Sequence, residues 1–199
     1  MATSTKPTLT FEKFLEQYPQ DGCYELIDGK IVRILATRQH EDIADYIADA
    51  MKEEVKRFKL NYKVSERIVQ RTITKEGKEQ GRHPDVSVVD KTMWRSERLA
   101  YTALHAPIQL AVEVVSTNWE DDYIDKLEEY EIIGIGEYWI VDYLALGSRT
   151  YLGNPKVPSV FVHLLEEGKY QSTRFQGTDR IISPTFPKLN LTVEDILAV

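Results

Sequence analysis

The chain has 199 residues, of which 42% are hydrophobic and 29% are charged. This balance is typical of a globular protein and excludes a chain that is disordered over most of its length. A formal net charge of −7 counts against a protein that coats nucleic acid non-specifically, because such binding depends on an excess of Lys and Arg. The single cysteine, Cys23, excludes an internal disulfide and agrees with a reducing compartment.

The length predicts one domain over residues 1–199, because a chain of this size can bury a core of its own. Residues 1–8 are expected to be flexible. They lack the apolar stretch of an export signal, and no later segment reaches the roughly 18 apolar residues that a membrane-spanning helix needs. We therefore expect a cytoplasmic protein that does not enter a membrane.

The first elements are predicted from caps, turns and periodicity. Thr10 can cap a short helix that Pro19 ends. Asp28-Gly29 is the expected tight turn of a hairpin over residues 24–35. Apolar residues recur at three- and four-residue spacing over 40–58, which indicates a long amphipathic helix.

The middle of the chain is predicted to contain a strand–helix–strand unit, and its end a second hairpin. The elements expected after residue 60 are a strand over 62–72, a charged loop over 75–82, strands over 85–89 and 108–115, a helix over 121–133, a strand over 138–141, a hairpin of 160–165 with 170–175, and a capped helix from about Thr192. This order of elements predicts an α/β protein.

Two acidic residues lie in strands where an ionised side chain is costly. Side chains alternate along 108–115, so Glu113 points to the same side as Ala111 and Val115. Asp85 opens another apolar run. A buried carboxylate needs a partner or a metal, and neighbouring strands would bring both acids within reach of one hard cation, Mg²⁺ or Mn²⁺.

The helix that follows the Glu113 strand provides a candidate ammonium. Asp122, Lys126 and Tyr130 share one helix face because they are four residues apart. A metal held by two carboxylates polarises a phosphoryl oxygen and activates its bound water, and a nearby ammonium can stabilise the developing charge. These are the parts that phosphodiester hydrolysis requires.

An ordered set of motifs carries a family resemblance. The motifs are Tyr24-Glu25-Leu26-Ile27-Asp28-Gly29, Pro84-Asp85-Val86, Val112-Glu113-Val114-Val115-Ser116, Asp122 with Lys126, and Glu137-Tyr138-Trp139-Ile140-Val141-Asp142. With them the chain resembles the Uma-two family of bacterial restriction endonucleases, cyanobacterial type, in the PD-(D/E)XK nuclease superfamily. The resemblance implies a restriction-endonuclease-like core: a central mixed β-sheet flanked by helices, with N-terminal and C-terminal hairpins. It also implies a divalent metal, DNA as the substrate and often a homodimer.

The resemblance assigns roles to four residues. Asp85 and Glu113 match the family's metal-binding acids, Lys126 matches the catalytic lysine moved onto the following helix, and Glu25 matches an early acid that could complete the metal shell. One position departs from the superfamily pattern, because the lysine usually stands two residues after the second acid, where this chain has Val115. Catalysis therefore depends on Lys126 reaching the site from the helix.

Each candidate also has a structural interpretation. The two strand acids could be satisfied by backbone donors or by Arg82 and Lys126. Lys126 could form an ordinary salt bridge with Asp122. Glu25 belongs to a hairpin, where an acid is more often solvated.

Other polar and aromatic residues are expected to be structural although some could contact a substrate. They are His40, His83, Ser116, Asp142, Tyr130, Tyr138 and Trp139. The histidines could serve as bases or ligands, but helix capping and loop packing are the expected roles. The serine and the aspartate are expected in turns, and the aromatic residues in the core or at a dimer surface.

Three functions are compatible with the sequence. The first is a metal-dependent endonuclease that hydrolyses DNA phosphodiester bonds. The second is a catalytically idle relative that keeps the fold for binding, which Val115 and the acidic net charge favour. The third is a metal-dependent hydrolase of small phosphate esters, for which an acidic surface is no obstacle.

Overall fold

A computed structural model describes residues 8–199, so the predicted flexible segment lies outside this range except for Thr8. The helices are α1 (Phe11–Glu16), α2 (Arg38–Phe58), α3 (Lys91–Ser96), a π-helical turn (Asp121–Asp125) that runs into α4 (Lys126–Ile133), α5 (Arg149–Leu152) and α6 (Val193–Leu197). The strands are β1 (Cys23–Ile27), β2 (Lys30–Ile34), β3 (Tyr62–Ser65), β4 (Val69–Ile73), β5 (Glu79–Arg82), β6 (Val86–Asp90), β7 (Ala103–Leu104), β8 (Leu110–Val114), β9 (Glu137–Asp142), β10 (Ser159–Glu166) and β11 (Lys169–Phe175). None of the described helices is long and apolar enough to cross a membrane.

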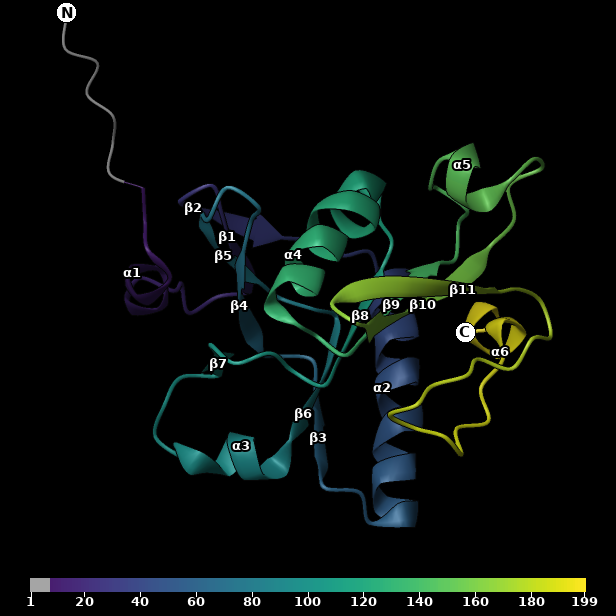
Figure 1. Cartoon of the computed structure of the whole chain (residues 1–199), viewed down its shortest axis with the longest axis horizontal. Coiled ribbons are helices and arrows are strands. Elements are labelled where there is room, and N and C mark those ends of the chain that lie inside the picture. Colours follow the sequence, from purple (N-terminus) through teal and green to yellow (C-terminus); the bar gives the residue numbers. More distant parts are fainter. Residues whose placement is uncertain (1–7) are drawn as a thin grey trace, which may run out of the picture.

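The strands form two mixed sheets (Figure 1). The larger has the order β11-β10-β9-β8-β6-β3, in which β8 and β9 are parallel and the other pairs antiparallel. The smaller has the order β2-β1-β5-β4-β7, with only β4 and β7 parallel. The predicted mixed α/β fold with a hairpin near each end is therefore confirmed. The strands that were expected in one central sheet are divided between two sheets.

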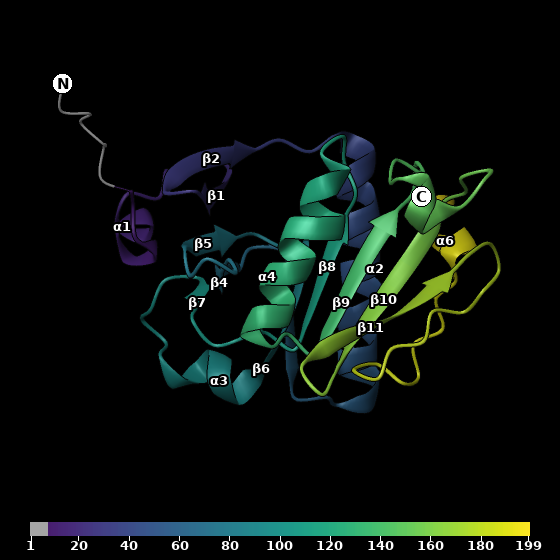
Figure 2. The same ribbon diagram turned by 45° about the horizontal axis from the view of Figure 1, so that its top comes forward.

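Helices cover both faces of the larger sheet. Figure 2 shows α4 in front of β8 and β9, with α2 behind them. The apolar stripe of α2, including Ile43 and Ile47, packs with Val112 of β8 in one core. Tyr130 of α4 packs with Ala111 in the other. The predicted alternation along β8 is thus confirmed, and it turns Glu113 toward α4.

Helix α1 packs against the smaller sheet. Thr10 caps this helix as predicted, accepting a hydrogen bond from the Lys13 amide. Phe11 and Phe14 are buried against the sheet, where a Cβ atom added to Gly81 would lie 3.0 to 3.1 Å from their rings. Gly81 therefore permits the close approach of helix and strand.

Two predictions for the segment after α2 were wrong. Residues 62–72 form two strands because β3 pairs with β6 while β4 pairs with β5 in the other sheet. Glu66, in the bend between them, is 2.6 Å from the Lys52 ammonium. The predicted loop 75–82 contains β5, which pairs with β4 after a tight turn.

His163 in β10 gives the fold a measurable pH dependence. Its ring stacks on Tyr138, its Nε2 has no hydrogen-bond partner among the described residues, and burial lowers its pKa to about 4. The unfolded chain therefore takes up a proton on this side chain near pH 6.5, whereas the folded chain takes it up only near pH 4. Above pH 6.5 the His163 side chain costs no stability, and between pH 6.5 and 4 the free energy of unfolding falls as the pH falls. Between pH 7 and 5 we expect the wild type to lose about 2 kcal/mol of unfolding free energy relative to His163→Phe, measured by urea denaturation. If the free energy of unfolding falls by the same amount in both proteins between pH 7 and 5, His163 is not the cause.

Candidate active site

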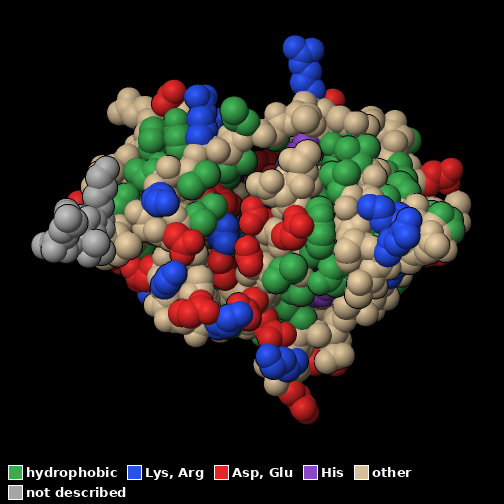
Figure 3. Space-filling model, turned by 90° about the horizontal axis from the view of Figure 1, so that it is seen from above, with side chains coloured by type: hydrophobic (Ala, Val, Ile, Leu, Met, Phe, Trp, Pro, Cys, Tyr) green, Lys and Arg blue, Asp and Glu red, His purple; other side chains and the backbone are tan. Residues whose placement is uncertain are grey.

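The predicted site residues meet at one end of the larger sheet, beside a cavity of about 330 Å³. Among the residues that line it are Glu25, His40, His83, Asp85, Glu113, Ser116, Asp122 and Lys126. Figure 3 views this end, where acidic side chains gather near the middle of the face beside a hollow. We call Glu25, Asp85, Glu113 and Asp122 the carboxylate cluster.

Lys126 lies among these acids. Its ammonium is 2.8 Å from Glu113 Oε2 and 3.0 Å from Asp122 Oδ1, and 3.9 Å from Glu25 Oε1. The helix therefore brings Lys126 to the strand acid, as the resemblance requires. The local salt bridge to Asp122 also exists, so the functional and the structural interpretations of Lys126 describe the same contacts.

The π-helical turn before α4 sets the start of this helix face. It contains Asp122, and Lys126 follows as the first residue of α4. Such turns are rare and often mark functional sites. Val115, where the resemblance would place a lysine, is fully buried in the core on the α4 side. An apolar side chain is accommodated there while the ammonium arrives from the helix.

Glu113 is held by two donors and surrounded by negative charge. Its Oε1 accepts a hydrogen bond of 2.6 Å from the Tyr130 hydroxyl, and Lys126 donates to its Oε2. Burial raises the pKa of Glu113 well above its usual range; Lys126 opposes the rise, and Asp85 and Asp122 add to it. Burial likewise raises the pKa of Asp122 to about 6. Burial and the neighbouring acids therefore both disfavour the charged forms of Glu113 and Asp122.

Asp85 joins the cluster from the segment that precedes β6. Its Oδ2 accepts a hydrogen bond of 2.7 Å from the Val114 amide, which ties it to the strand of Glu113. Its Oδ1 lies 2.9 Å from His40 Nε2. Burial lowers the pKa of His40, but the hydrogen bond and charge of Asp85 outweigh that effect and raise it above its usual value.

Glu25 is buried, so the expectation of a solvated hairpin acid was wrong. Its Oε1 accepts from the His83 amide at 3.0 Å, and its Oε2 is 3.2 Å from Arg82 Nη1. Arg82 also binds Glu129 through two hydrogen bonds, of 2.8 and 2.6 Å. Glu25 thus shares a fully buried guanidinium with an acid on α4 while it lines the cavity.

The sequence predicts a structural role for His40, whereas its imidazole contacts Asp85. Its place in the first turn of a long helix carries no signal of this contact. Arg82 was considered a partner for Asp85 or Glu113, but it pairs with Glu25 and Glu129 instead. Glu129 was not identified, since a glutamate in a helix is ordinary.

Of the other residues considered, Asp142, Tyr138 and Trp139 have the structural positions expected of them, whereas Ser116 was expected in a turn and lines the cavity instead. Asp142 accepts hydrogen bonds from the Leu146 and Gly147 amides and supports a turn. Tyr138 and Trp139 are buried in the two cores. Ser116 is exposed at the cavity.

A metal at this site would rest on two carboxylates. Over residues 8–199, no three or more His, Cys, Asp or Glu side chains converge as a ready-made metal-binding group. Mg²⁺ is commonly held by one or two carboxylates together with water and substrate oxygens. The donor set of Asp85 and Glu113 fits this requirement, because both side chains line the same cavity.

The geometry can be compared with known proteins. A family model described as "Uma2: Putative restriction endonuclease" matches residues 11–194. Among solved structures, the chain is similar to a "putative nuclease belonging to DUF820" from Anabaena variabilis, with a TM-score of 0.71 and 16% sequence identity over 96% of this chain and 98% of that chain. At this identity the likeness shows the fold alone. No curated protein matches the chain.

Proposed function

The chain belongs to the Uma2 family, and on that premise we propose that it is a divalent-metal-dependent endonuclease that hydrolyses phosphodiester bonds in DNA. The observation that carries the proposal is the meeting of Asp85, Glu113 and Lys126 at one cavity. These residues come from three separate elements, and a fold has no packing reason to bury several acids around one ammonium. Buried charges of this kind are typical of functional sites.

We propose that Asp85 and Glu113 hold the metal, which would supply Lewis acidity to the phosphoryl oxygen and lower the pKa of bound water. The Val114 amide and the Tyr130 hydroxyl orient these two carboxylates through the hydrogen bonds described above. The contacts with Glu113 and Asp122 hold the Lys126 ammonium at the cavity, where we propose that it binds a phosphate oxygen and stabilises the charge that develops during hydrolysis. Glu25 is a further acid at the cavity and orients Lys126.

His40 is proposed as a positioning residue. It reaches Asp85 from the first turn of α2 and is held in place by the Thr37 cap, whose hydroxyl accepts a hydrogen bond from the His40 amide at 3.2 Å. Groups that bond to a metal-binding carboxylate commonly tune its affinity about 10- to 100-fold. A homodimer, which the resemblance implies, stays a prediction.

The proposal is tested by titrating Mn²⁺ and Mg²⁺ into the purified chain and assaying nicking of supercoiled DNA in the same samples. The wild type is expected to bind metal and to nick DNA, and EDTA is expected to abolish nicking. Lys126→Gln, which keeps a donor for Glu113, is expected to bind metal but to nick roughly 100-fold more slowly. Exposed Lys188→Gln is the control and should match the wild type.

The outcomes separate the alternatives. A chain that binds no metal at millimolar concentration and cleaves nothing is the idle relative. A chain that hydrolyses bis(p-nitrophenyl) phosphate but not DNA is a hydrolase of small phosphate esters. Either result overturns the proposed function.

A further inference from the structure

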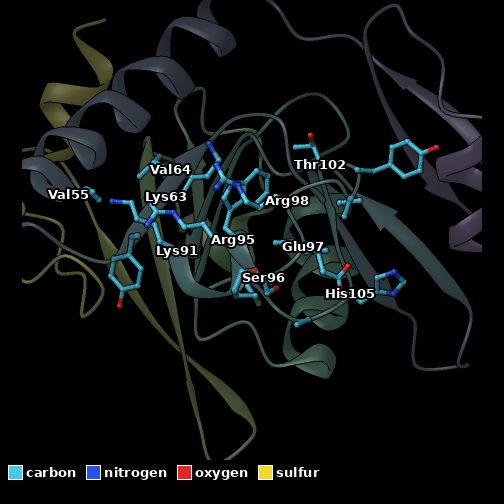
Figure 4. A pocket seen from close by; sticks show the side chains of 18 of the residues that line it. Val55, Lys63, Val64, Lys91, Arg95, Ser96, Glu97, Arg98, Thr102 and His105 are labelled. Carbon is cyan, nitrogen blue, oxygen red and sulfur yellow. Dashed lines mark hydrogen bonds between the residues drawn. The ribbon is translucent and has the colours of Figure 1, made fainter.

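A second and larger cavity, of about 890 Å³, lies between the edges of the two sheets. One wall is β3, the edge strand of the larger sheet, and another is β7, the edge strand of the smaller sheet. The end of α2 and the segment from Lys91 to Ala106, which begins with α3, complete it. We call this cavity the basic pocket (Figure 4).

The pocket concentrates positive charge in a chain with a net charge of −7. Its basic residues are Lys52, Lys56, Lys63, Lys91, Arg95 and Arg98, and among residues 8–199 the only acid that lines it is Glu97. Figure 4 shows Lys63, Lys91, Arg95 and Arg98 beside one another, with Thr102 and His105 on the other side. A chance distribution of the charged residues of an acidic protein would not be expected to gather six basic residues around one pocket.

Most of these cations are not neutralised by the protein. Lys52 forms ion pairs with Glu66 and Asp49. Within residues 8–199, no carboxylate lies within 4.0 Å of the other five side chains. Lys56, Arg95 and Arg98 are exposed and therefore accessible to a polyanion.

Aromatic side chains line the basic pocket together with the cations. Lys63 lies over the Trp94 ring, with its ammonium 5.0 Å from the ring centroid. Tyr101 is 68% exposed. Asp90 caps α3 by accepting from the Thr92 and Met93 amides at 2.7 and 3.1 Å, which fixes the helix that carries Arg95. Cations interleaved with aromatic rings are the composition of a nucleic-acid-binding surface.

We propose that the basic pocket binds the phosphate backbone of DNA at a place separate from the carboxylate cluster. The choice of DNA rests on the proposed function, and charge complementarity selects a polyanion. Strand β6 joins the two places, with Asp85 before its first residue and Lys91 after its last. Six residues of extended chain span roughly 20 Å, which is about six base-pair steps of a duplex. The two places therefore lie roughly 20 Å apart, at the two ends of β6.

Binding is measured by fluorescence anisotropy with a labelled 20-base-pair duplex in EDTA, so that metal and cleavage play no part. Arg95→Glu/Arg98→Glu is expected to weaken binding at least about tenfold at 150 mM salt and to reduce the slope of log K against log salt by about 2. Arg95→Gln/Arg98→Gln should fall between it and the wild type. The control Lys13→Glu/Lys188→Glu makes the same change in net charge at exposed residues outside the pocket and should change affinity less than about twofold at 150 mM salt.

A second readout separates this inference from the proposed function. If both hold, Arg95→Glu/Arg98→Glu raises KM for plasmid DNA and leaves hydrolysis of bis(p-nitrophenyl) phosphate unchanged, because that substrate is too small to reach the pocket. If the wild type cleaves nothing but the binding result stands, the proposed function fails and the pocket still binds DNA. If the chain cleaves DNA but the pocket and control pairs weaken binding equally, the pocket inference is overturned. Tighter binding of polyglutamate than of DNA would also overturn it, because the partner would then be an acidic protein.

Discussion

Glu113→Gln is expected to reduce DNA nicking at least about 1,000-fold, which corresponds to roughly 4 kcal/mol of transition-state stabilisation. The amide keeps the shape of the side chain but loses the negative charge that would hold a cation. It also places an NH₂ group against one of two donors, Lys126 or Tyr130, both of which bond to Glu113. Metal titration should show a matching loss of affinity. The measurement is the initial rate of nicking at saturating Mg²⁺.

The matched control for this substitution is Glu137→Gln. Glu137 is also a buried acid in a neighbouring strand, but it accepts hydrogen bonds from the Trp139 indole and the Thr185 amide and does not line the active-site cavity. Its substitution should lower thermal stability and leave metal affinity and the nicking rate of the folded protein unchanged. Equal losses of activity in both variants would mean that Glu113 serves only the fold.

Arg82→Met is expected to lower the free energy of unfolding by about 3–5 kcal/mol. Arg82 is 2% exposed and bonds to Glu25 and Glu129, which are also buried. Without the guanidinium, two carboxylates are left in a site with too little water to solvate them. Urea denaturation at pH 7.5 measures the loss.

Arg71→Met on the neighbouring strand is the control. Arg71 pairs with the partly exposed Glu79, so its removal should cost less than about 1 kcal/mol. Adding Glu129→Met to Arg82→Met should recover part of the stability, since one of the two unpaired charges is then absent. If Arg71→Met and Arg82→Met lower the free energy of unfolding by similar amounts, the burial of the Arg82 ion pairs does not make them more important for stability than the partly exposed Arg71 pair.

The sequence by itself determined the parts of the fold that depend on local chemistry. Thr10 and Thr192 mark helix starts because their hydroxyls accept from nearby amides. Alternation along β8 placed Glu113 on the side opposite Val112, since successive side chains of a strand point to opposite faces. The four-residue spacing of Asp122 and Lys126 put their contact within one helix turn. These features involve residues close together in the chain.

Only the tertiary structure decided which strands share a sheet and which charges meet. Nothing local to residues 62–82 shows that β3 joins the larger sheet while β4 and β5 join the smaller, because strand pairing depends on partners distant in the chain. The same holds for the contact of His40 with Asp85 and for the burial of Glu25 by Arg82. Each links side chains more than 40 residues apart. These two contacts are strong because they form in a buried environment of low polarity. That environment exists only after the sheets and helices have packed.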